Sequence, residues 1–224
     1  WMALYMRGRT EAPGKVKKVL VTGASGFVGQ HLVPRLIKEG YLVRTLVRSS
    51  NLECKDESSS VEQCEGDLSN LDSLRCACKG VGFVVHLAGN AHVAGEQQIN
   101  VDGMRRLLAA AVENDVTRFL FLSSSLAADA EHPHRASTPY GDSKLAAEKI
   151  LMSEHFTGSI EGVVLRPVNI YGPRMKGNIA KLISMIAKGK ALPLPILNTR
   201  ISLISVQDVS EAVVLGLESR SASG

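Results

Sequence analysis

The sequence predicts an α/β protein built on a doubly wound, mainly parallel sheet with helices on both faces. Three observations support this prediction. Short apolar runs rich in β-branched residues alternate with segments of helical spacing from residue 16 to residue 166. Strands that alternate with helices imply right-handed crossovers and parallel pairing. After Arg166 the alternation ends, and proline and glycine become frequent.

The elements follow in order along the chain. Residues 16–22 form an apolar run that ends in Gly23, which predicts the first strand. Helical spacing over 27–39, closed by Gly40, predicts the first helix. Further elements are predicted as strands at 42–47 and 61–65, a helix at 71–79, a strand at 83–87, a helix at 100–114, a strand at 119–122, a helix at 140–154 and a strand at 162–165.

The region after Arg166 is predicted to be rich in loops. Within it we predict a helix at 179–188, a strand at 201–206 and a final helix that Asp208 caps. The first fifteen residues lack both a regular pattern and a signal-peptide apolar core, and we expect a disordered extension there.

Composition excludes several classes of protein. The 224 residues fit one folded unit, and 45% hydrophobic with 21% charged residues is typical of a globular protein. No apolar run is long enough to span a bilayer, so we expect a cytoplasmic protein without a membrane partner. The formal charge of +4 is spread along the chain, which predicts no nucleic-acid partner. Cysteine and histidine spacings predict no metal site.

Three glycines follow the first predicted strand. Gly23, Gly26 and Gly29 are spaced three apart and open the first predicted helix. Glycines at this position let the backbone turn sharply and approach a pyrophosphate held at the helix N-terminus. The pattern therefore predicts a dinucleotide site, with an ordinary structural turn as the alternative.

The end of the second predicted strand indicates which dinucleotide would bind. A chain that binds NAD usually places a carboxylate there for the ribose hydroxyls, whereas this segment is Leu46-Val47-Arg48. Arg48 could pair with the 2′-phosphate of NADP instead. NAD or NADP is therefore expected, with NADP slightly favoured, and a solvated arginine is the alternative.

Tyr140 and Lys144 are four positions apart in a predicted helix. Residues at i and i+4 share a helix face, so a phenol and an ammonium would meet there. An adjacent positive charge favours the phenolate and makes tyrosine usable as an acid and base. The pair predicts hydride-transfer chemistry if the glycine loop holds a nicotinamide, and a solvated helix face is the alternative.

These features resemble a family, the extended short-chain dehydrogenases, and within it the nucleotide-sugar epimerases, dehydratases and 4-reductases. The resemblance covers about residues 17 to 218. Its seven elements occur in the family's order, namely Thr22 to Gly29, Gly66-Asp67-Leu68, His86 to Gly89, Asn100 to Gly103, Ser123-Ser124-Ser125, Pro139 to Lys144, and Arg166-Pro167 with Tyr171-Gly172-Pro173.

The resemblance implies roles for individual residues. Tyr140 would transfer the proton, and Lys144 would bind the nicotinamide ribose and lower the tyrosine pKa. Ser124 would hydrogen bond to the reacting oxygen, with Ser125 as the second candidate. Ser123 is expected only to satisfy backbone groups at the strand end.

The resemblance also implies two binding sets. The cofactor-binding set is Gly23, Ser25, Gly26, Phe27, Val28, Gly29, Arg48, Asp67, Leu68, Leu87, Ala88, Gly89, Asn100, Tyr140, Lys144, Pro167 and Val168. The substrate-binding set is Ser124, Ser125, Asn169, Lys176, Asn178 and Arg200. Residues 16–166 would then form a Rossmann-like dinucleotide-binding domain, and 167–224 a partial substrate-binding region. The family also forms dimers through a four-helix contact, so a homodimer is expected.

Two departures from the family's pattern affect the substrate side. Ile201 stands where family members commonly carry a phosphate-binding arginine, although Arg200 is its neighbour. The family also continues beyond the position of Gly224, so the substrate lobe is expected to be incomplete.

The leading function is an NAD(P)-dependent 4-epimerase or 4-ketoreductase of UDP-hexoses. The stretches Gly172 to Asn178 and Leu192 to Pro195 resemble bacterial enzymes that act at C4 for surface polysaccharides. One alternative is an NADPH-dependent reductase of small carbonyl or dihydroflavonol-like compounds. Another is a catalytically weak regulatory protein that binds the cofactor.

Overall fold

A six-stranded parallel sheet forms the centre of the computed structural model, which describes residues 17–48, 61–89, 96–132, 134–189 and 201–224. Its order is β3-β2-β1-β4-β5-β6, and each neighbouring pair is parallel. The strands are β1 (Lys18–Thr22), β2 (Leu42–Val47), β3 (Val61–Glu65), β4 (Phe83–His86), β5 (Arg118–Leu122) and β6 (Glu161–Leu165). The order reverses between β1 and β4, and the carboxyl ends of strands at such a reversal form the usual ligand crevice.

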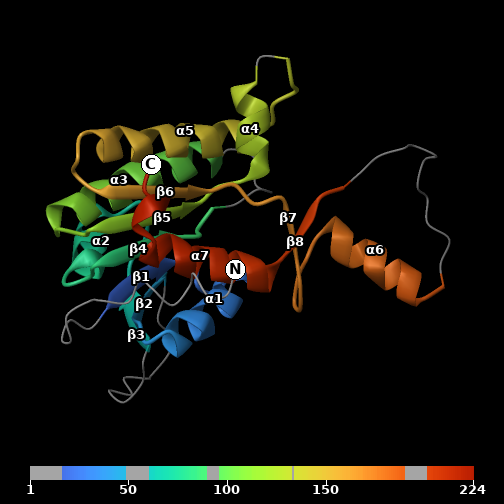
Figure 1. Ribbon diagram of the computed structural model, residues 1–224, viewed down its shortest axis with the longest axis horizontal. Helices are drawn as coiled ribbons and strands as arrows, with labels where there is room; N and C mark the ends of the chain where they lie inside the picture. Colours follow the sequence, from blue (N-terminus) through green and yellow to red (C-terminus); the bar gives the residue numbers. More distant parts are fainter. Residues whose placement is uncertain (1–16, 49–60, 90–95, 133, 190–200) are drawn as a thin grey trace.

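Helices cover both faces of the sheet (Figure 1). On one face lie α1 (Phe27–Lys38) and α7 (Val206–Glu218), and on the other lie α2 (Leu71–Cys78), α3 (Glu96–Glu113) and α5 (Pro139–Phe156). The short helix α4 (Ser125–Glu131) packs against α5. None of the helices in the described ranges is long and apolar enough to cross a membrane.

Alternation along the strands divides the core into two. Val19 and Val21 of β1 enter the core beneath α1 and α7, whereas Leu20 between them enters the core beneath α2, α3 and α5. All three side chains are fully buried. This period of two is what a sheet covered on both faces requires.

A buried arginine fixes β5 to the last helix. Nη1 of Arg118 donates to the carbonyls of Gly216, Leu217 and Ser219 at 2.9, 3.0 and 2.7 Å. These carbonyls belong to the C-terminal end of α7, where backbone acceptors lack partners within the helix. The strand whose end carries the serines is therefore anchored at its start.

A second, smaller sheet extends from the main body (Figure 1). It pairs β7 (Asn169–Tyr171) in parallel with β8 (Leu203–Ser205), and α6 (Asn178–Ala187) lies beyond it. A short 3-10 helix, η2 (Arg220–Ala222), follows α7. This part of the chain corresponds to the predicted loop-rich region.

The predicted fold class is confirmed, and the differences are local. The sequence pattern did not predict α4 or β7, and α3 begins at Glu96 rather than at residue 100. The prediction that Asp208 caps the final helix is wrong. Ser205 is the N-cap residue, and its hydroxyl accepts the backbone N–H of Asp208 at 3.0 Å.

Candidate active site

The glycine turn after β1 is packed against backbone. Gly23 has φ +73°, and a Cβ added there would lie 2.8 Å from the amide nitrogen of Ala88. A Cβ on Gly29 would lie 2.5 Å from the Cα and carbonyl oxygen of Ala24. Both positions therefore require glycine, and they bring the start of α1 close to the loop that follows β4.

The N-terminus of α1 is available to an anion. Its N-cap residue is Gly26, which provides no side-chain cap, and the first turn carries no acidic residue. The backbone N–H groups of a first turn lack partners within the helix and attract phosphate. Ser25, Phe27 and Val28 surround this end of the helix, so the structure brings together the residues predicted to bind the pyrophosphate.

The loops after β2 and β3 carry the polar residues predicted for the other end of the cofactor. Arg48 is exposed directly after β2. Asp67 accepts the backbone N–H of Ser69 at 2.7 Å. Hydrogen bonds from the Ser69 side chain and backbone, together with the positive charge of Arg48, lower the Asp67 pKa. Leu68 packs beside Gly103 of α3. Arg48 and Asp67 therefore lie close enough for their charges to interact.

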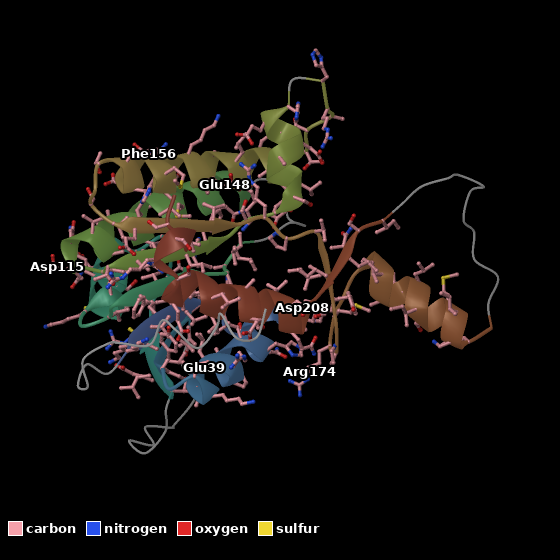
Figure 2. All side chains as sticks on the ribbon, viewed as in Figure 1. Glu39, Asp115, Glu148, Phe156, Arg174 and Asp208 are labelled. Carbon is pink, nitrogen blue, oxygen red and sulfur yellow. The ribbon has the colours of Figure 1, made fainter. Side chains whose placement is uncertain are left out.

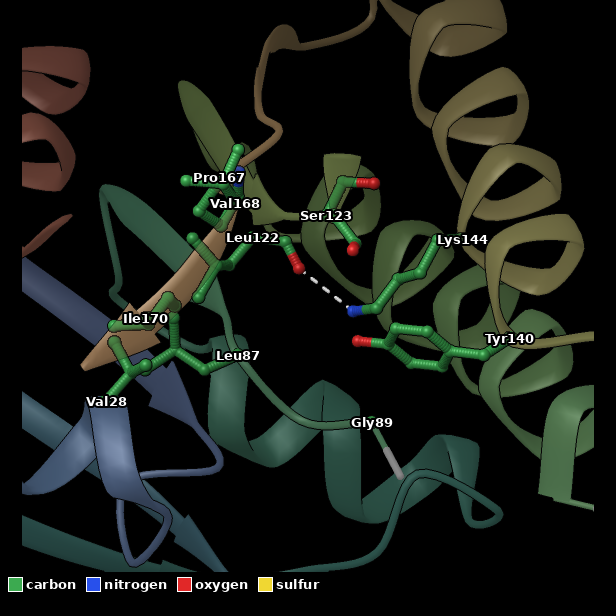
Figure 3. Close-up of a pocket in the computed structure, with 11 residues that line it drawn as sticks. Val28, Leu87, Gly89, Leu122, Ser123, Tyr140, Lys144, Pro167, Val168 and Ile170 are labelled. Atoms are coloured by element: carbon green, nitrogen blue, oxygen red, sulfur yellow. Dashed lines mark hydrogen bonds between the residues drawn. The ribbon is translucent and has the colours of Figure 1, made fainter. Parts of the chain in front are cut away.

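A cavity of about 280 Å³ lies at the carboxyl ends of β4, β5 and β6 (Figure 3). It lies beside the reversal of strand order between β1 and β4, where a ligand crevice is expected. Its lining residues come from five separate segments, namely Val28, Leu87, Gly89, Leu122, Ser123, Ser124, Tyr140, Lys144, Pro167, Val168 and Ile170. Eight of these belong to the predicted site, whereas Leu122, Ser123 and Ile170 do not.

Helix α5 presents Tyr140 and Lys144 to this cavity. The helix begins with Pro139 at its first position, and the hydroxyl of Thr138 caps it by accepting the backbone N–H of Gly141 at 3.0 Å. Nζ of Lys144 donates to the carbonyl of Leu122 at 2.9 Å and lies 5.7 Å from the centre of the Tyr140 ring. The two side chains meet as their i, i+4 spacing predicts (Figure 3).

Burial controls the protonation of both groups. Desolvation lowers the pKa of Lys144 to about 8, and the Glu148 carboxylate partly opposes that effect. Desolvation raises the pKa of Tyr140. The predicted lowering of the tyrosine pKa by Lys144 is therefore not found. The Lys144 ammonium donates its hydrogen bond to the backbone carbonyl of Leu122 rather than to the phenol. Desolvation of the phenol therefore determines the direction of the Tyr140 pKa shift.

The three serines after β5 differ in their bonding. The hydroxyl of Ser124 lines the cavity and caps α4 by accepting the backbone N–H of Leu126 at 3.2 Å. Ser125 does not line the cavity, and its backbone N–H donates to the carbonyl of Pro167 at 2.9 Å. The hydroxyl of Ser123 is buried and has no hydrogen-bond partner within the described ranges. The expectation that Ser123 serves only backbone groups is wrong for its side chain.

His86 is a buried side chain that packs behind Lys144 through the Phe121 ring. Nδ1 of His86 lies 2.7 Å from the hydroxyl of Thr22. Its ring stacks on Phe121 with 5.5 Å between centres, and Nζ of Lys144 lies 4.5 Å from the centre of the same Phe121 ring. Burial, together with the charge of Lys144, lowers the His86 pKa to about 3, so the ring is neutral. The sequence pattern contained His86 in a motif but indicated no role for it.

The remaining predicted residues are not among the described residues that line the cavity. Asn100 places Oδ1 near Gly89, and a Cβ added to Gly89 would lie 3.8 Å from that oxygen. Asn169 is exposed on β7, where its Nδ2 donates to the carbonyl of Ser202 at 3.4 Å. Lys176 is exposed before α6, and Asn178 begins that helix. Arg200 lies outside the described residues.

Comparison with known proteins agrees with this geometry. The model of the NAD dependent epimerase/dehydratase family matches residues 19–224. A UDP-glucose 4-epimerase from Vibrio cholerae is 32% identical over 219 residues, which cover 88% of this chain and 66% of the relative. The chain spans 66% and 59% of the lengths of the first two curated relatives.

Solved structures show the same fold. A UDP-N-acetylglucosamine 4-epimerase from Bacillus cereus superposes with a TM-score of 0.79 at 25% identity, covering 93% of this chain and 74% of that one. MoeE5 in complex with UDP-glucuronic acid and NAD superposes with a TM-score of 0.77 at 29% identity, covering 92% of this chain and 74% of that one.

Proposed function

The chain belongs to the NAD dependent epimerase/dehydratase family, and on that premise we propose that it is an NAD(P)-dependent enzyme that oxidises or reduces C4 of a UDP-hexose. The observation that carries the proposal is the convergence of Ser124, Tyr140 and Lys144 on one cavity at the reversal of the strand order. A hydroxyl, a phenol and an ammonium are the groups needed to move a proton at a carbonyl or alcohol oxygen.

The residues around the cavity fit a nicotinamide dinucleotide. The uncapped start of α1 would receive the pyrophosphate, because Gly23 and Gly29 let the backbone approach without side chains. Leu87, Pro167 and Val168 would border the nicotinamide end, and Asp67 with Leu68 would lie at the adenine end. The bound cofactor would supply hydride acceptance and donation at the sugar carbon.

The protein's own residues would manage the proton. When the C4 hydroxyl is oxidised with the cofactor as hydride acceptor, the hydroxyl proton would pass to the Tyr140 phenolate, giving a ketone and a neutral phenol. Reduction reverses these transfers. Ser124 would hydrogen bond to the reacting oxygen, and Lys144 would hold the cofactor ribose.

Substrate class rests on the relatives and on the region after Arg166. The relatives that match over most of this chain include 4-epimerases of UDP-glucose and UDP-N-acetylglucosamine. Asn169, Lys176 and Asn178 are proposed to contact the nucleotide sugar, together with Arg200. Residues 16–166 would then serve the cofactor and 167–224 the substrate.

Arg48 supports a preference for NADP. It is exposed at the end of β2, and that strand end carries no carboxylate to hold the ribose hydroxyls of NAD. Solved relatives include one with bound NAD. Dissociation constants for NADH and NADPH, measured by the fluorescence of the nicotinamide, would test the preference, and tighter binding of NADH would contradict it.

One experiment separates the candidate reactions. The protein is incubated with UDP-glucose, UDP-galactose and their N-acetyl forms, with and without added NADPH, and the sugars are identified by chromatography. Interconversion of the C4 epimers without net cofactor change would identify an epimerase. Reduction of 4-keto sugars that consumes NADPH would identify a ketoreductase. Turnover of small carbonyl or dihydroflavonol-like compounds alone, or cofactor binding without any turnover, would refute the proposed substrate class.

A further inference from the structure

Another buried polar side chain lies on the face of α5 that carries Tyr140 and Lys144. Glu148 is one turn beyond Lys144, so the three residues form one stripe along the helix. The Glu148 side chain is 5% exposed, and it lies on α5 near α4 (Figure 2). A carboxylate buried to this extent requires a partner of opposite charge.

Arg166 is that partner. Its Nε lies 3.0 and 3.1 Å from the two carboxylate oxygens of Glu148, and its Nη2 donates to Oε2 at 2.6 Å. Nη1 donates to Glu131 of α4 at 2.9 Å. These bonds raise the pKa of Arg166. The guanidinium therefore joins α4 and α5 to the end of β6 through charge-assisted bonds of fixed geometry.

The arginine stands directly before the wall of the cavity. Pro167 and Val168 line the side of the cavity that faces Tyr140 and Lys144 (Figure 3). The carbonyl of Pro167 accepts the backbone N–H of Ser125, and the carbonyl of Leu165 accepts that of Ser123. The segment from 165 to 168 is thus held on one side by the serine loop and on the other by the bond from Arg166 to α5.

Glu148 is also the charge that acts on Lys144. The other groups that face the ammonium are the Tyr140 phenol on α5, the neutral His86 ring from β4, and the Leu122 carbonyl with the Phe121 ring from β5. From the α3 side, Asn100 brings an uncharged amide near Gly89. Among these described neighbours, Glu148 contributes the negative charge that opposes the effect of burial.

We propose that the Glu148–Arg166 pair is a positioning pair for the active site. Its carboxylate, one helical turn from Lys144, opposes the loss of charge that burial favours, and its guanidinium fixes the 166–168 wall to α5. The inference rests on the proposed function only in so far as Lys144 and that wall act on a nicotinamide cofactor.

The charge effect can be measured without cofactor. The side-chain nitrogen of Lys144 is followed by ¹⁵N NMR from pH 6 to pH 10, with the signal assigned by its loss in Lys144→Met. Glu148→Gln keeps the shape and removes the charge, and it should move the Lys144 titration down by about one pH unit, a tenfold change. Glu131→Gln is the matched control, because Glu131 bonds to the same arginine but is 56% exposed. Its titration should stay within about 0.3 units of wild type.

An unchanged titration in Glu148→Gln, or an equal shift in Glu131→Gln, would overturn the charge effect whether or not the protein binds a cofactor. A wild-type protein that binds neither NADH nor NADPH would instead refute the proposed function and leave the titration valid.

The wall is tested by Arg166→Lys, which keeps the charge but cannot bond both carboxylate oxygens in a fork. We expect the affinity for the nicotinamide cofactor to fall at least fivefold while the Lys144 titration stays unchanged. Wild-type affinity in this variant would overturn the positioning of the wall. If Glu148→Gln does not fold, as judged by circular dichroism, Arg166→Lys decides the proposal alone.

Discussion

Gly23→Ala perturbs the turn that would receive the pyrophosphate. Gly23 has φ +73°, and the added Cβ would lie 2.8 Å from the amide nitrogen and 3.0 Å from the Cα of Ala88. These are backbone atoms, so the contact is relieved only if the loop after β4 or the turn itself moves. The variant combines an unfavourable backbone conformation with a clash at the proposed cofactor site.

The expected loss in the free energy of unfolding of Gly23→Ala is the sum of these two costs. A left-handed conformation costs a residue other than glycine about 1–2 kcal/mol, and the stiffer unfolded chain returns about 0.4–1 kcal/mol. Overpacking against backbone adds about 1–3 kcal/mol. The net loss of about 1–4.6 kcal/mol corresponds to a Tm lower by about 2–18 °C in a protein of this size.

Gly158→Ala is the matched control. Gly158 has φ +79°, but nothing lies within 4 Å of its added Cβ. This variant carries the backbone cost alone, about 0–1.6 kcal/mol after the return from the stiffer unfolded chain. Thermal unfolding followed by circular dichroism, and NADH titration followed by fluorescence, are measured for both variants. Gly23→Ala should have a lower Tm than Gly158→Ala, and it should bind NADH at least about tenfold more weakly than that control. Equal Tm values with unchanged NADH affinity would refute the assignment of this turn.

Three further predictions concern single side chains. Ser123→Ala should leave the free energy of unfolding within about 0.5 kcal/mol of wild type, because the hydroxyl makes no bond that is lost; a large loss of stability in urea would contradict this. Lys144→Met should stabilise the protein by about 1–3 kcal/mol at pH 7, because burial lowers the Lys144 pKa from 10.5 to about 8. Between about pH 8 and pH 10.5 the unfolded wild-type chain binds more protons than the folded one, so wild-type stability rises with pH. The stabilisation by Lys144→Met should therefore be smaller in urea unfolding at pH 10 than at pH 7. The same stabilisation at both pH values would exclude this cause. Arg48→Ala should weaken NADPH binding about tenfold and NADH binding little, and equal losses would remove Arg48 from the 2′-phosphate.

Much of the fold could be predicted because most strands of the main sheet are apolar and are bounded by glycine or a polar turn. β1 and β2 are short runs rich in β-branched residues that the parallel sheet largely buries, and α1 between them places Leu32 and Leu36 on one buried face. α4 escaped prediction because its serine start resembles a loop, and only the cap by Ser124 shows that a helix begins there. β7 has three residues, and its pairing partner is more than thirty positions away in the sequence.

The candidate site was predictable where local spacing carries the information. Tyr140 and Lys144 share a helix face in any α-helix, so their meeting required no tertiary knowledge. The bonding of Ser123, the stacking of His86 and the partnership of Glu148 with Arg166 depend on which strand ends and helices come together in space. Burial also reversed one expectation, because desolvation raises the Tyr140 pKa where charge proximity alone predicted a lower value.

Tyr140→Phe is the most direct test of the proposed centre. The substitution removes the phenolic oxygen and leaves the ring that packs beside Lys144. With the UDP-hexose that the wild-type protein converts, turnover should fall by about a hundredfold or more, while the NADH or NADPH dissociation constant stays within about twofold. Turnover close to wild type in this variant would contradict the assignment of Tyr140 as the group that exchanges the proton.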